Sequence, residues 1–316
     1  MEALAVILEN PGELALRRIA LQPAGADDVT VAMAWSGIST GTERLLWQGK
    51  MPAFPGMGYP LVPGYESAGT VISAGPMSGR KVGDRVFVPG ANCYGPVKGL
   101  FGGAASKAVL PGRRTVSMPQ NLAEDGTLLA LAATAMHALA GEAGGAPRLP
   151  DLIVGHGVVG RLLARLTLAL GGSAPTVWET QSQRRDGDFG YPVVTPESDA
   201  RRDYQRIVDA SGDSDVLDKI IPRLAKGGEV VLAGFYSGRV GFAFPPAFMR
   251  EARLRIAAEW SPEDMTTVTG LLATGCLSLA GLITHRSAAS DAASAYATAF
   301  DDPQCLKMVL DWSDIS

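Results

Sequence analysis

The stretch from residue 152 to residue 179 restricts the fold more than any other part of the chain. Residues 152–154 (Leu-Ile-Val) form a short apolar run, which is typical of a buried parallel strand. Residues 155–160 fit the pattern G-x-G-x-x-G, and apolar residues then recur at helical spacing. Residues 176–178 resume a strand that ends at Glu179. This order of elements predicts an α/β domain with a doubly wound parallel sheet of the Rossmann type.

Each glycine of this loop has a physical task if the loop binds a dinucleotide. Gly155 permits a tight turn, Gly157 lets a pyrophosphate approach the backbone, and Gly160 lets the helix pack against the strand. Glu179 stands near the spacing of about 20 residues expected for a carboxylate that binds the ribose hydroxyls. We therefore predict a cofactor site that includes Gly155, His156, Gly157, Val158, Val159, Gly160 and Glu179. The alternative is a glycine-rich turn without a ligand.

Two further strand ends are expected at the same crevice. The apolar run before Ser211 and Gly212 and the run before Gly234 both suit buried parallel strands. Loops at the carboxyl ends of such strands meet at one edge of the sheet, so these three residues join the predicted cofactor site. Glu179 favours NAD because a carboxylate repels a 2′-phosphate, whereas Arg184, which follows the same strand, keeps NADP open.

Composition excludes several classes of protein. The chain has 316 residues, enough for two domains, and its net charge of −4 argues against a nucleic-acid partner. The longest apolar stretch, residues 128–140, is shorter than the roughly 20 residues of a membrane-spanning helix. The N-terminus lacks the basic start of a signal peptide, and three widely spaced cysteines offer no disulfide framework, so we expect a cytoplasmic protein. A mean hydropathy of +0.13 is consistent with a homodimer interface or an apolar substrate surface.

Short motifs along almost the whole chain carry a family resemblance. They are GISTGTE at 37–43, VPGYESAG at 62–69, KVGDRV at 81–86, the glycine loop at 155–160 and LITHR at 282–286. With them, the chain resembles the medium-chain dehydrogenase/reductase superfamily. That resemblance implies a chaperonin-10-like β-barrel domain over residues 1–122, rejoined by residues 258–316, and a Rossmann domain over residues 123–257. It also implies that Thr134 lies beside the nicotinamide.

The chain departs from the zinc-dependent members at each ligand position. Those members have a cysteine where Thr40 stands and a histidine where Tyr65 stands, and the third position here is Ala130. Threonine and alanine do not supply the sulfur or nitrogen ligands that zinc prefers. The four-cysteine lobe is also missing, since that region contains Cys93 alone. We therefore predict a member without a metal.

A closer resemblance is to the dehydrogenases of bacteriochlorophyll biosynthesis. The stretches that carry it are residues 35–47, 51–66 and 99–105. The resemblance implies NAD-dependent oxidation of a 1-hydroxyethyl group on C3 of a tetrapyrrole to an acetyl group. The residue pattern alone indicates only a zinc-free nicotinamide enzyme.

Without zinc, a positioned side chain has to accept or relay the hydroxyl proton. Tyr65 is the first candidate because it stands at a former ligand position, although a phenol with a pKa near 10 is a poor base at neutral pH. Thr42 matches the hydroxyl residue that relays protons in the zinc enzymes, and Glu66 is a candidate proton acceptor. The alternative for each of these side chains is a purely structural role. For Glu43 we favour that alternative, in which the carboxylate holds the barrel together.

Large apolar side chains in loops broken by glycine and proline suit the flat face of a tetrapyrrole. We expect the substrate to contact Thr40, Trp47, Phe54, Tyr59 and Phe101. Ordinary loop packing is the alternative for these residues.

Two other functions remain open at this point. One is an NADPH-dependent quinone or enone reductase, since many zinc-free relatives catalyse that reaction. The other is a nucleotide-binding sensor without catalysis, because an intact glycine loop beside altered ligand positions permits it.

Overall fold

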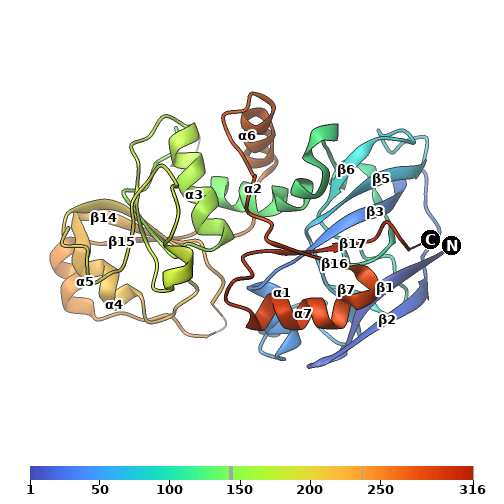
Figure 1. Ribbon diagram of the computed structural model, residues 1–316, viewed down its shortest axis with the longest axis horizontal. Helices are drawn as coiled ribbons and strands as arrows, with labels where there is room; N and C mark the ends of the chain where they lie inside the picture. Colours follow the sequence, from blue (N-terminus) through green and yellow to red (C-terminus); the bar gives the residue numbers. More distant parts are fainter. Residues whose placement is uncertain (142–144, 237, 316) are drawn as a thin grey trace. The chain divides into compact units, whose positions relative to one another are not determined.

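The protein is described by a computed structural model over residues 1–141, 145–236 and 238–315 (Figure 1). Its contacts divide it into two compact units, one of Met1–Ala130 with Ala280–Ser316 and the other of Leu131–Leu279. These boundaries lie further along the chain than residues 122 and 258, where the sequence analysis placed them. The assignment of domains stays a prediction.

The first unit is built from two sheets. A four-stranded sheet has the order β2-β1-β4-β7, and a seven-stranded sheet has the order β16-β17-β3-β5-β6-β9 with β8 paired to β3. The strands are β1 (Glu2–Asn10), β2 (Glu13–Ala20), β3 (Asp28–Ile38), β4 (Leu61–Val62), β5 (Ser67–Ala74), β6 (Arg85–Val88), β7 (Lys98–Gly99), β8 (Lys107–Pro111), β9 (Val116–Ser117), β16 (His285–Ala288) and β17 (Met308–Asp311).

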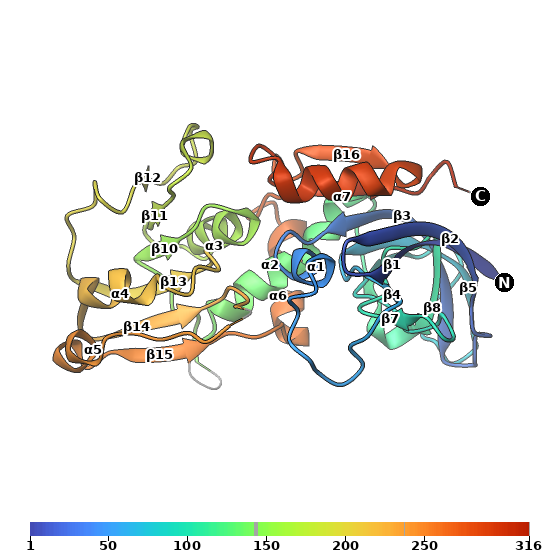
Figure 2. The ribbon, with the colours of Figure 1, turned by 90° about the horizontal axis from the view of Figure 1, so that it is seen from below.

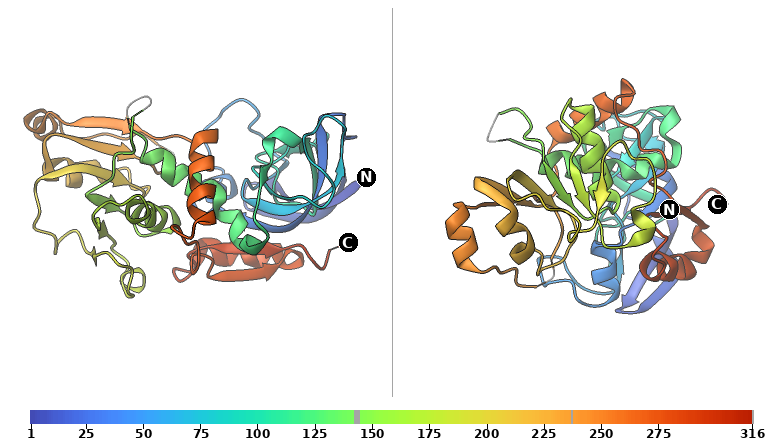
Figure 3. Two further views of the ribbon diagram at one scale, coloured as in Figure 1. Left: turned by 90° about the horizontal axis from the view of Figure 1, so that it is seen from above. Right: turned by 60° about the vertical axis from the view of Figure 1, so that its left-hand side comes forward.

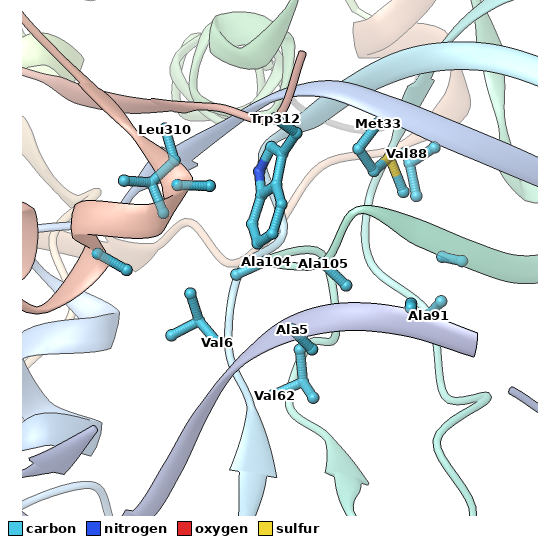
Figure 4. Packing of buried hydrophobic residues seen from close by; sticks show 14 of the residues in the cluster. Ala5, Val6, Met33, Val62, Val88, Ala91, Ala104, Ala105, Leu310 and Trp312 are labelled. Atoms are coloured by element: carbon cyan, nitrogen blue, oxygen red, sulfur yellow. The ribbon is translucent and has the colours of Figure 1, made fainter. Parts of the chain in front are cut away.

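Alternation along β3 explains how this unit forms a core. Val29, Val31 and Met33 recur every second residue and are buried together on one face of the strand. They pack in one apolar cluster with residues of β1 and of the C-terminal segment. Figure 4 shows the indole of Trp312 among these side chains, close to Met33 and Leu310.

The C-terminal segment returns to the first unit. It contains β16, the helix α7 (Ala292–Asp301) and β17, and β17 pairs antiparallel with β3 so that Val309 lies opposite Gly37. Figure 3 shows this red segment packed as one block beside the blue N-terminal strands. The short helix α1 (Thr42–Trp47) follows β3 directly.

The second unit is built on a six-stranded parallel sheet. The strands are β10 (Leu152–Val154), β11 (Thr176–Trp178), β12 (Val193–Val194), β13 (Tyr204–Asp209), β14 (Leu224–Leu232) and β15 (Arg253–Ile256). Their order, β12-β11-β10-β13-β14-β15, is visible from top to bottom in Figure 2. The order reverses at β10, which is the topological switch point where doubly wound sheets bind ligands.

The helix after the glycine loop is α3 (Val158–Ala169), which begins after Gly157. Its apolar stripe buries Leu162, Leu163 and Leu166. The other helices are α2 (Leu129–Ala138), α4 (Leu217–Ile220), α5 (Phe244–Arg250) and α6 (Pro262–Ala273). Over the described residues, no helix has both the length and the apolar character needed to cross a bilayer.

Candidate active site

The glycine loop connects β10 to α3 with the geometry that its sequence requires. Gly155 has a φ of +94°, which favours glycine. A Cβ on Gly160 would lie 1.9 Å from the Gly155 carbonyl oxygen, so the helix approaches the turn too closely for any side chain. A Cβ on Gly157 would meet nothing within 4 Å. Val158 is buried and Val159 is half-buried in the first turn of α3, so the open space lies at the middle glycine.

Glu179 lies at the end of β11 and is buried. Its Oε2 accepts a hydrogen bond from the His156 amide at 3.1 Å, and its Oε1 accepts one from the Gln181 amide at 2.8 Å. The Arg185 guanidinium donates to the carbonyls of Glu179 and Thr180. The carboxylate therefore joins the end of β11 to the glycine loop.

The His156 side chain is buried under the segment that follows β11. Its Nδ1 lies 2.7 Å from the Arg184 carbonyl, which only accepts, so Nδ1 carries the proton. Its Nε2 then accepts from the Tyr191 hydroxyl at 3.0 Å, and Phe189 packs edge-on at 4.7 Å. Burial lowers the pKa of His156 to about 4, which keeps the imidazole neutral. His156 therefore fastens the segment 184–191 to the glycine loop, a contact that the sequence analysis did not foresee.

Arginine side chains surround this segment. The Arg161 guanidinium lies 4.9 Å from the centre of the Phe189 ring, and its Nε donates to the His156 carbonyl at 3.2 Å. The Nε of Arg184 is buried without a hydrogen-bond partner among the described residues. Arg184 thus lies in the predicted cofactor site, and its Nε is free to bind a ligand there.

The three loops expected at one edge of the sheet do converge. A Cβ on Gly155 would lie 3.1 Å from the Ser211 nitrogen, and one on Gly234 would lie 3.2 Å from the Gly212 nitrogen. The structure therefore brings Ser211, Gly212 and Gly234 together with the glycine loop. Thr134 is half-buried on α2, and no hydrogen bond within the described residues joins it to these loops.

A buried carboxyl group supports the loop after β13, and the sequence analysis missed it. Asp209 accepts hydrogen bonds from the Tyr236 hydroxyl and, at 2.9 Å, from the Ser211 amide. Burial raises the pKa of Asp209, and these hydrogen bonds act in the opposite direction. An acidic residue at the end of an apolar strand was the available signal.

In the first unit, a pair of hydroxyl groups forms at the turn between β3 and α1. The Ser39 Oγ lies 2.9 Å from the Tyr65 hydroxyl, and we call these two side chains the hydroxyl pair. Thr42 begins α1, and its amide donates to the Ser39 Oγ at 3.4 Å. Thr40, the residue that the sequence analysis placed at the former ligand position, is exposed.

The reason for this difference is one extra residue in the turn. In the motif of the zinc-dependent members, a single residue, the cysteine, stands between Gly-Ile and Gly-Thr. Here two residues, Ser39 and Thr40, stand between Ile38 and Gly41. Alignment from the C-terminal side selects Thr40, and alignment from the N-terminal side selects Ser39. In the structure, Ser39 is the residue that meets Tyr65.

Two buried carboxylates, Glu43 and Glu66, lie next to the hydroxyl pair. Glu43 accepts hydrogen bonds from the Ser39 amide at 3.0 Å and from the Tyr296 hydroxyl at 2.5 Å. Burial raises the pKa of Glu43 to about 7, against the effect of these hydrogen bonds. Glu66 forms an ion pair with Lys307, and burial raises the pKa of Glu66 while the lysine opposes the shift.

These surroundings decide the protonation of Tyr65. Burial and the nearby Glu66 charge raise the pKa of Tyr65 well above its ordinary value, although hydrogen bonds from Ser39 and Thr42 lower it. Tyr65 therefore remains a phenol at neutral pH and acts as a hydrogen-bond donor or a relay.

Lys307, Tyr296 and Ser39 were all missed by the sequence analysis. A signal existed for Lys307, which is a single charged residue in the apolar run of residues 306–310. Nothing near Tyr296 in the sequence indicates its carboxylate partner, because that partner lies 253 positions away.

The predicted substrate residues lie in different surroundings. Phe101 is 40% exposed and packs edge-on against Tyr65, with ring centres 5.6 Å apart. Trp47 and Tyr59 are half-buried in a smaller apolar cluster, where the Tyr59 hydroxyl donates to the carbonyl of Leu46. Phe54 is exposed on the loop between α1 and β4. Of the five predicted substrate residues, Phe101 is thus the one in ring contact with Tyr65.

The side chains at the former ligand positions do not fit zinc. Hydroxyl groups of Ser39 and Tyr65 meet there, whereas zinc in proteins prefers thiolate, imidazole and carboxylate ligands. Ala130 carries no donor at the third position. Across the described part of the chain, no three His, Cys, Asp or Glu side chains gather closely enough to hold a metal ion.

Comparison with known proteins gives consistent results. Residues 25–120 match the alcohol dehydrogenase GroES-like domain. The chain is 58% identical to a 2-desacetyl-2-hydroxyethyl bacteriochlorophyllide A dehydrogenase from Cereibacter sphaeroides, over 99% of both chains. It is 56% identical to the protein of that name from Rhodobacter capsulatus, again over 99% of both chains.

The solved structure of 2R,3R-butanediol dehydrogenase from Bacillus subtilis has a similar fold. It superimposes with a TM-score of 0.82 over 98% of this chain and 99% of its own, at 19% identity. The predicted fold class is confirmed: a chaperonin-10-like β domain is combined with a Rossmann-type α/β domain.

Proposed function

The chain belongs to the medium-chain dehydrogenase/reductase superfamily, in one family with these bacteriochlorophyllide dehydrogenases, and we propose that it oxidises the C3 1-hydroxyethyl group of a (bacterio)chlorophyllide to acetyl with NAD. The observation that carries this proposal is 58% identity over 99% of both chains. The local support is a hydroxyl site beside an exposed aromatic ring, Phe101, together with a glycine loop.

The cofactor fits the residues of the second unit. Gly155 to Gly160 would hold the pyrophosphate, because the space at Gly157 is open and the helix start supplies free amides. Glu179 would bind the ribose hydroxyls. Nicotinamide, when bound, supplies an acceptor for the hydride that leaves the substrate carbon.

NAD is favoured over NADP by charge. Glu179 brings a buried carboxylate to the place where a 2′-phosphate would bind. Two of the arginines nearby already have partners, since Arg161 packs on Phe189 and Arg185 donates to backbone carbonyls. Arg184 would then contact the cofactor through its buried, unpartnered Nε.

The hydroxyl pair would manage the proton. Tyr65 is a phenol at neutral pH, so it accepts the substrate proton only as it passes its own proton to the Thr42 hydroxyl, while the Ser39 Oγ holds the Tyr65 hydroxyl in place. Thr42, which hydrogen-bonds to Tyr65 and is half-buried, would continue this relay toward solvent. Glu66 is fully buried and paired with Lys307, so in this proposal it acts through its charge and by holding Tyr65. The reaction needs no metal ion.

The substrate would lie against the apolar side chains of the loops. Phe101 is the primary contact because it adjoins Tyr65 and is exposed. Phe54 and Thr40, which are also exposed, and the half-buried Trp47 and Tyr59 would border the tetrapyrrole.

The test is turnover with chemically verified 3-(1-hydroxyethyl) bacteriochlorophyllide a. Each nucleotide is supplied in turn while the red band of the pigment and the reduced cofactor are followed together. We expect NADH to form in equal amount to the shifted pigment, with NADP much less effective. Oxidation of NADPH with a quinone or enone instead would establish the reductase alternative. Cofactor binding without any turnover would favour a nucleotide-binding sensor.

A second copy of this chain is the partner that we propose for the β15 edge. β15 is the last strand of its sheet, and it exposes Leu254 and Ile256. Phe248 and Met249 of α5 are also exposed and line one hollow with Leu254. Two such edges pair with each other under two-fold symmetry, which covers the same residues on both copies. Light scattering should show a dimer that Ile256→Asp converts to a monomer, whereas the exposed Met77→Asp leaves it unchanged. A monomeric wild type contradicts this proposal.

The cytoplasmic location stays a prediction.

A further inference from the structure

Each of the two buried carboxylates directly follows a proposed catalytic hydroxyl in the sequence. Glu43 follows Thr42, and Glu66 follows Tyr65. Both carboxylates are almost completely buried, with exposed fractions of 1% and 0%. Groups of this kind need partners, because an unpaired buried charge is strongly destabilising.

The partner of Glu43 comes from α7. Tyr296 is 1% exposed, and its hydroxyl donates to Glu43 Oε2 at 2.5 Å. The other carboxylate oxygen of Glu43 accepts from the amide of Ser39 at 3.0 Å. The Tyr296 hydroxyl is thus linked through one carboxylate to the residue whose Oγ meets Tyr65.

The partner of Glu66 comes from the residue just before β17. Lys307 is 2% exposed, forms an ion pair with Glu66, and donates from Nζ to the Ile38 carbonyl at 3.0 Å. Gly37 leaves the space that this pair occupies, since a Cβ there would lie 2.6 Å from Glu66 Oε2 and 2.9 Å from the Lys307 Cε. The lysine thus contacts Ile38, just before Ser39, and Glu66, just after Tyr65.

The contact of Tyr296 with Glu43 and that of Lys307 with Glu66 are therefore independent, and both fix a residue next to the hydroxyl pair. Tyr296 comes from helix α7 of the returning C-terminal segment, and Lys307 comes from the residue that precedes β17 in the same segment. Each contacts a group beside the hydroxyl pair. On the premise of the proposed function, we propose that Tyr296 and Lys307 are positioning residues, which hold the hydroxyl pair in place by fixing the two carboxylates.

This role differs from substrate binding and from simple packing. Both side chains lie in the interior of the first unit, so their loss leaves the substrate surface unchanged and spares KM. A displaced hydroxyl pair lowers kcat instead, since a misplacement of about 1 Å costs roughly 100-fold in rate. Tyr296→Phe and Lys307→Met keep the volume of each side chain while they remove the hydroxyl and the charge.

The experiment compares these two variants with a matched control. Tyr204→Phe also removes a buried tyrosine hydroxyl that donates to a carboxylate, that of Asp199 at 2.6 Å, but it lies in the other unit. We expect kcat to fall roughly tenfold to 100-fold in Tyr296→Phe and Lys307→Met with KM unchanged, and to stay within about twofold in Tyr204→Phe. Equal kcat values in all three variants would overturn the proposal.

The pH profile gives a second readout for Tyr296. Groups that face Glu43 are the Ser39 amide, Tyr296, Glu66 and Lys307. The Tyr296 hydrogen bond lowers the pKa of Glu43, so its removal raises that pKa. The acid limb of kcat should therefore move to higher pH in Tyr296→Phe, and an unmoved limb with a reduced kcat would indicate a packing effect alone.

Two further experiments distinguish failure of this proposal from failure of the proposed function. The double variant Glu66→Gln/Lys307→Met carries no unpaired charge, so it is used if Lys307→Met does not fold. The ring-carbon signal of Tyr65 in 13C-tyrosine-labelled protein, assigned with Tyr65→Phe, reports on the site without turnover. A shift of that signal in Tyr296→Phe or the double variant, absent in Tyr204→Phe, supports positioning even if the wild type oxidises no chlorophyllide. An unshifted signal contradicts it.

Discussion

The two units shift the pKa of a buried ionisable group in opposite directions. In the second unit, burial lowers the pKa of His156 from 6.5 to about 4, and in the first unit burial raises that of Glu43 from 4.5 to about 7. Burial disfavours the charged form in both cases. His156 is held by Arg184 and Tyr191, which lie 28 and 35 positions further along the chain. Glu43 is held by a residue 253 positions away.

This difference separates a site that forms within one α/β unit from one that requires the whole chain. The surroundings of His156 come from one strand, one turn and the segment that follows. The surroundings of Glu43 and Glu66 exist only after the C-terminal segment has returned to β3. Variants at the long-range site should therefore have larger effects on stability than variants at the glycine loop.

The largest effect is expected from Lys307→Met. It leaves the Glu66 carboxylate buried without its partner, which costs about 3–5 kcal/mol in the free energy of unfolding. Urea denaturation followed by circular dichroism measures this loss. Adding Glu66→Gln should recover most of it, because both charges are then gone. If Lys307→Met is as stable as the wild type, the ion pair does not hold the first unit together.

The next effect is a pH dependence of opposite sign in the two units. The raised pKa of Glu43 means that the folded chain binds more protons than the unfolded chain between pH 4.5 and 7, so this contribution falls as pH rises. The lowered pKa of His156 means that the unfolded chain binds more protons than the folded chain between pH 4 and 6.5, so this contribution to stability is lost as pH falls. Each contribution is on the order of 3 kcal/mol.

Neutral substitutions separate these two contributions. Unfolding of Glu43→Gln over this pH range should show stability rising more steeply with pH than in the wild type. His156→Gln should show it falling more steeply. Curves parallel to that of the wild type would mean that the two groups titrate alike in the folded and unfolded chains.

The smallest effect on stability is expected at Gly157. An alanine there meets no atom within 4 Å, and the residue has an ordinary φ of −71°, so stability should stay within about 0.5 kcal/mol. The added methyl group would occupy the space proposed for the pyrophosphate, so NAD affinity measured by calorimetry should fall roughly tenfold or more. Gly160→Ala is the matched comparison, because its Cβ would clash at 1.9 Å with Gly155 and should destabilise the fold itself. Unchanged NAD affinity in Gly157→Ala would place the cofactor elsewhere.

The difference between the two units also explains which features could be predicted from the sequence. The glycine loop, the strand order around it and the convergence of Ser211, Gly212 and Gly234 follow from local patterns, because parallel strands place their carboxyl ends at one edge. Tyr65 was found because it occupies a motif position. The sequence analysis placed Thr40 at the former ligand position, whereas the adjacent Ser39 meets Tyr65 in the structure, and only the fold decides between two neighbouring hydroxyl residues.

The partners of the two carboxylates were beyond local reasoning. No periodicity connects residue 43 to residue 296, and pairing of β17 with β3 sets which side chains meet. The roles of Thr42, Tyr65 and Glu66 and those of the predicted substrate residues stay predictions, as do NAD as the acceptor and the absence of zinc.

Whether hydroxyl groups replace a metal in this dehydrogenase is decided by an assay of the metal-free enzyme. Protein treated with a chelator and shown by elemental analysis to lack zinc is assayed with the hydroxyethyl pigment and NAD, beside Tyr65→Phe treated in the same way. We expect full turnover without zinc, no gain when zinc is added, and a kcat lower by roughly 10² to 10⁴ in Tyr65→Phe. Turnover that is lost when zinc is removed and returns when zinc is added, or a Tyr65→Phe variant as active as the wild type, would show that hydroxyl groups do not replace the metal.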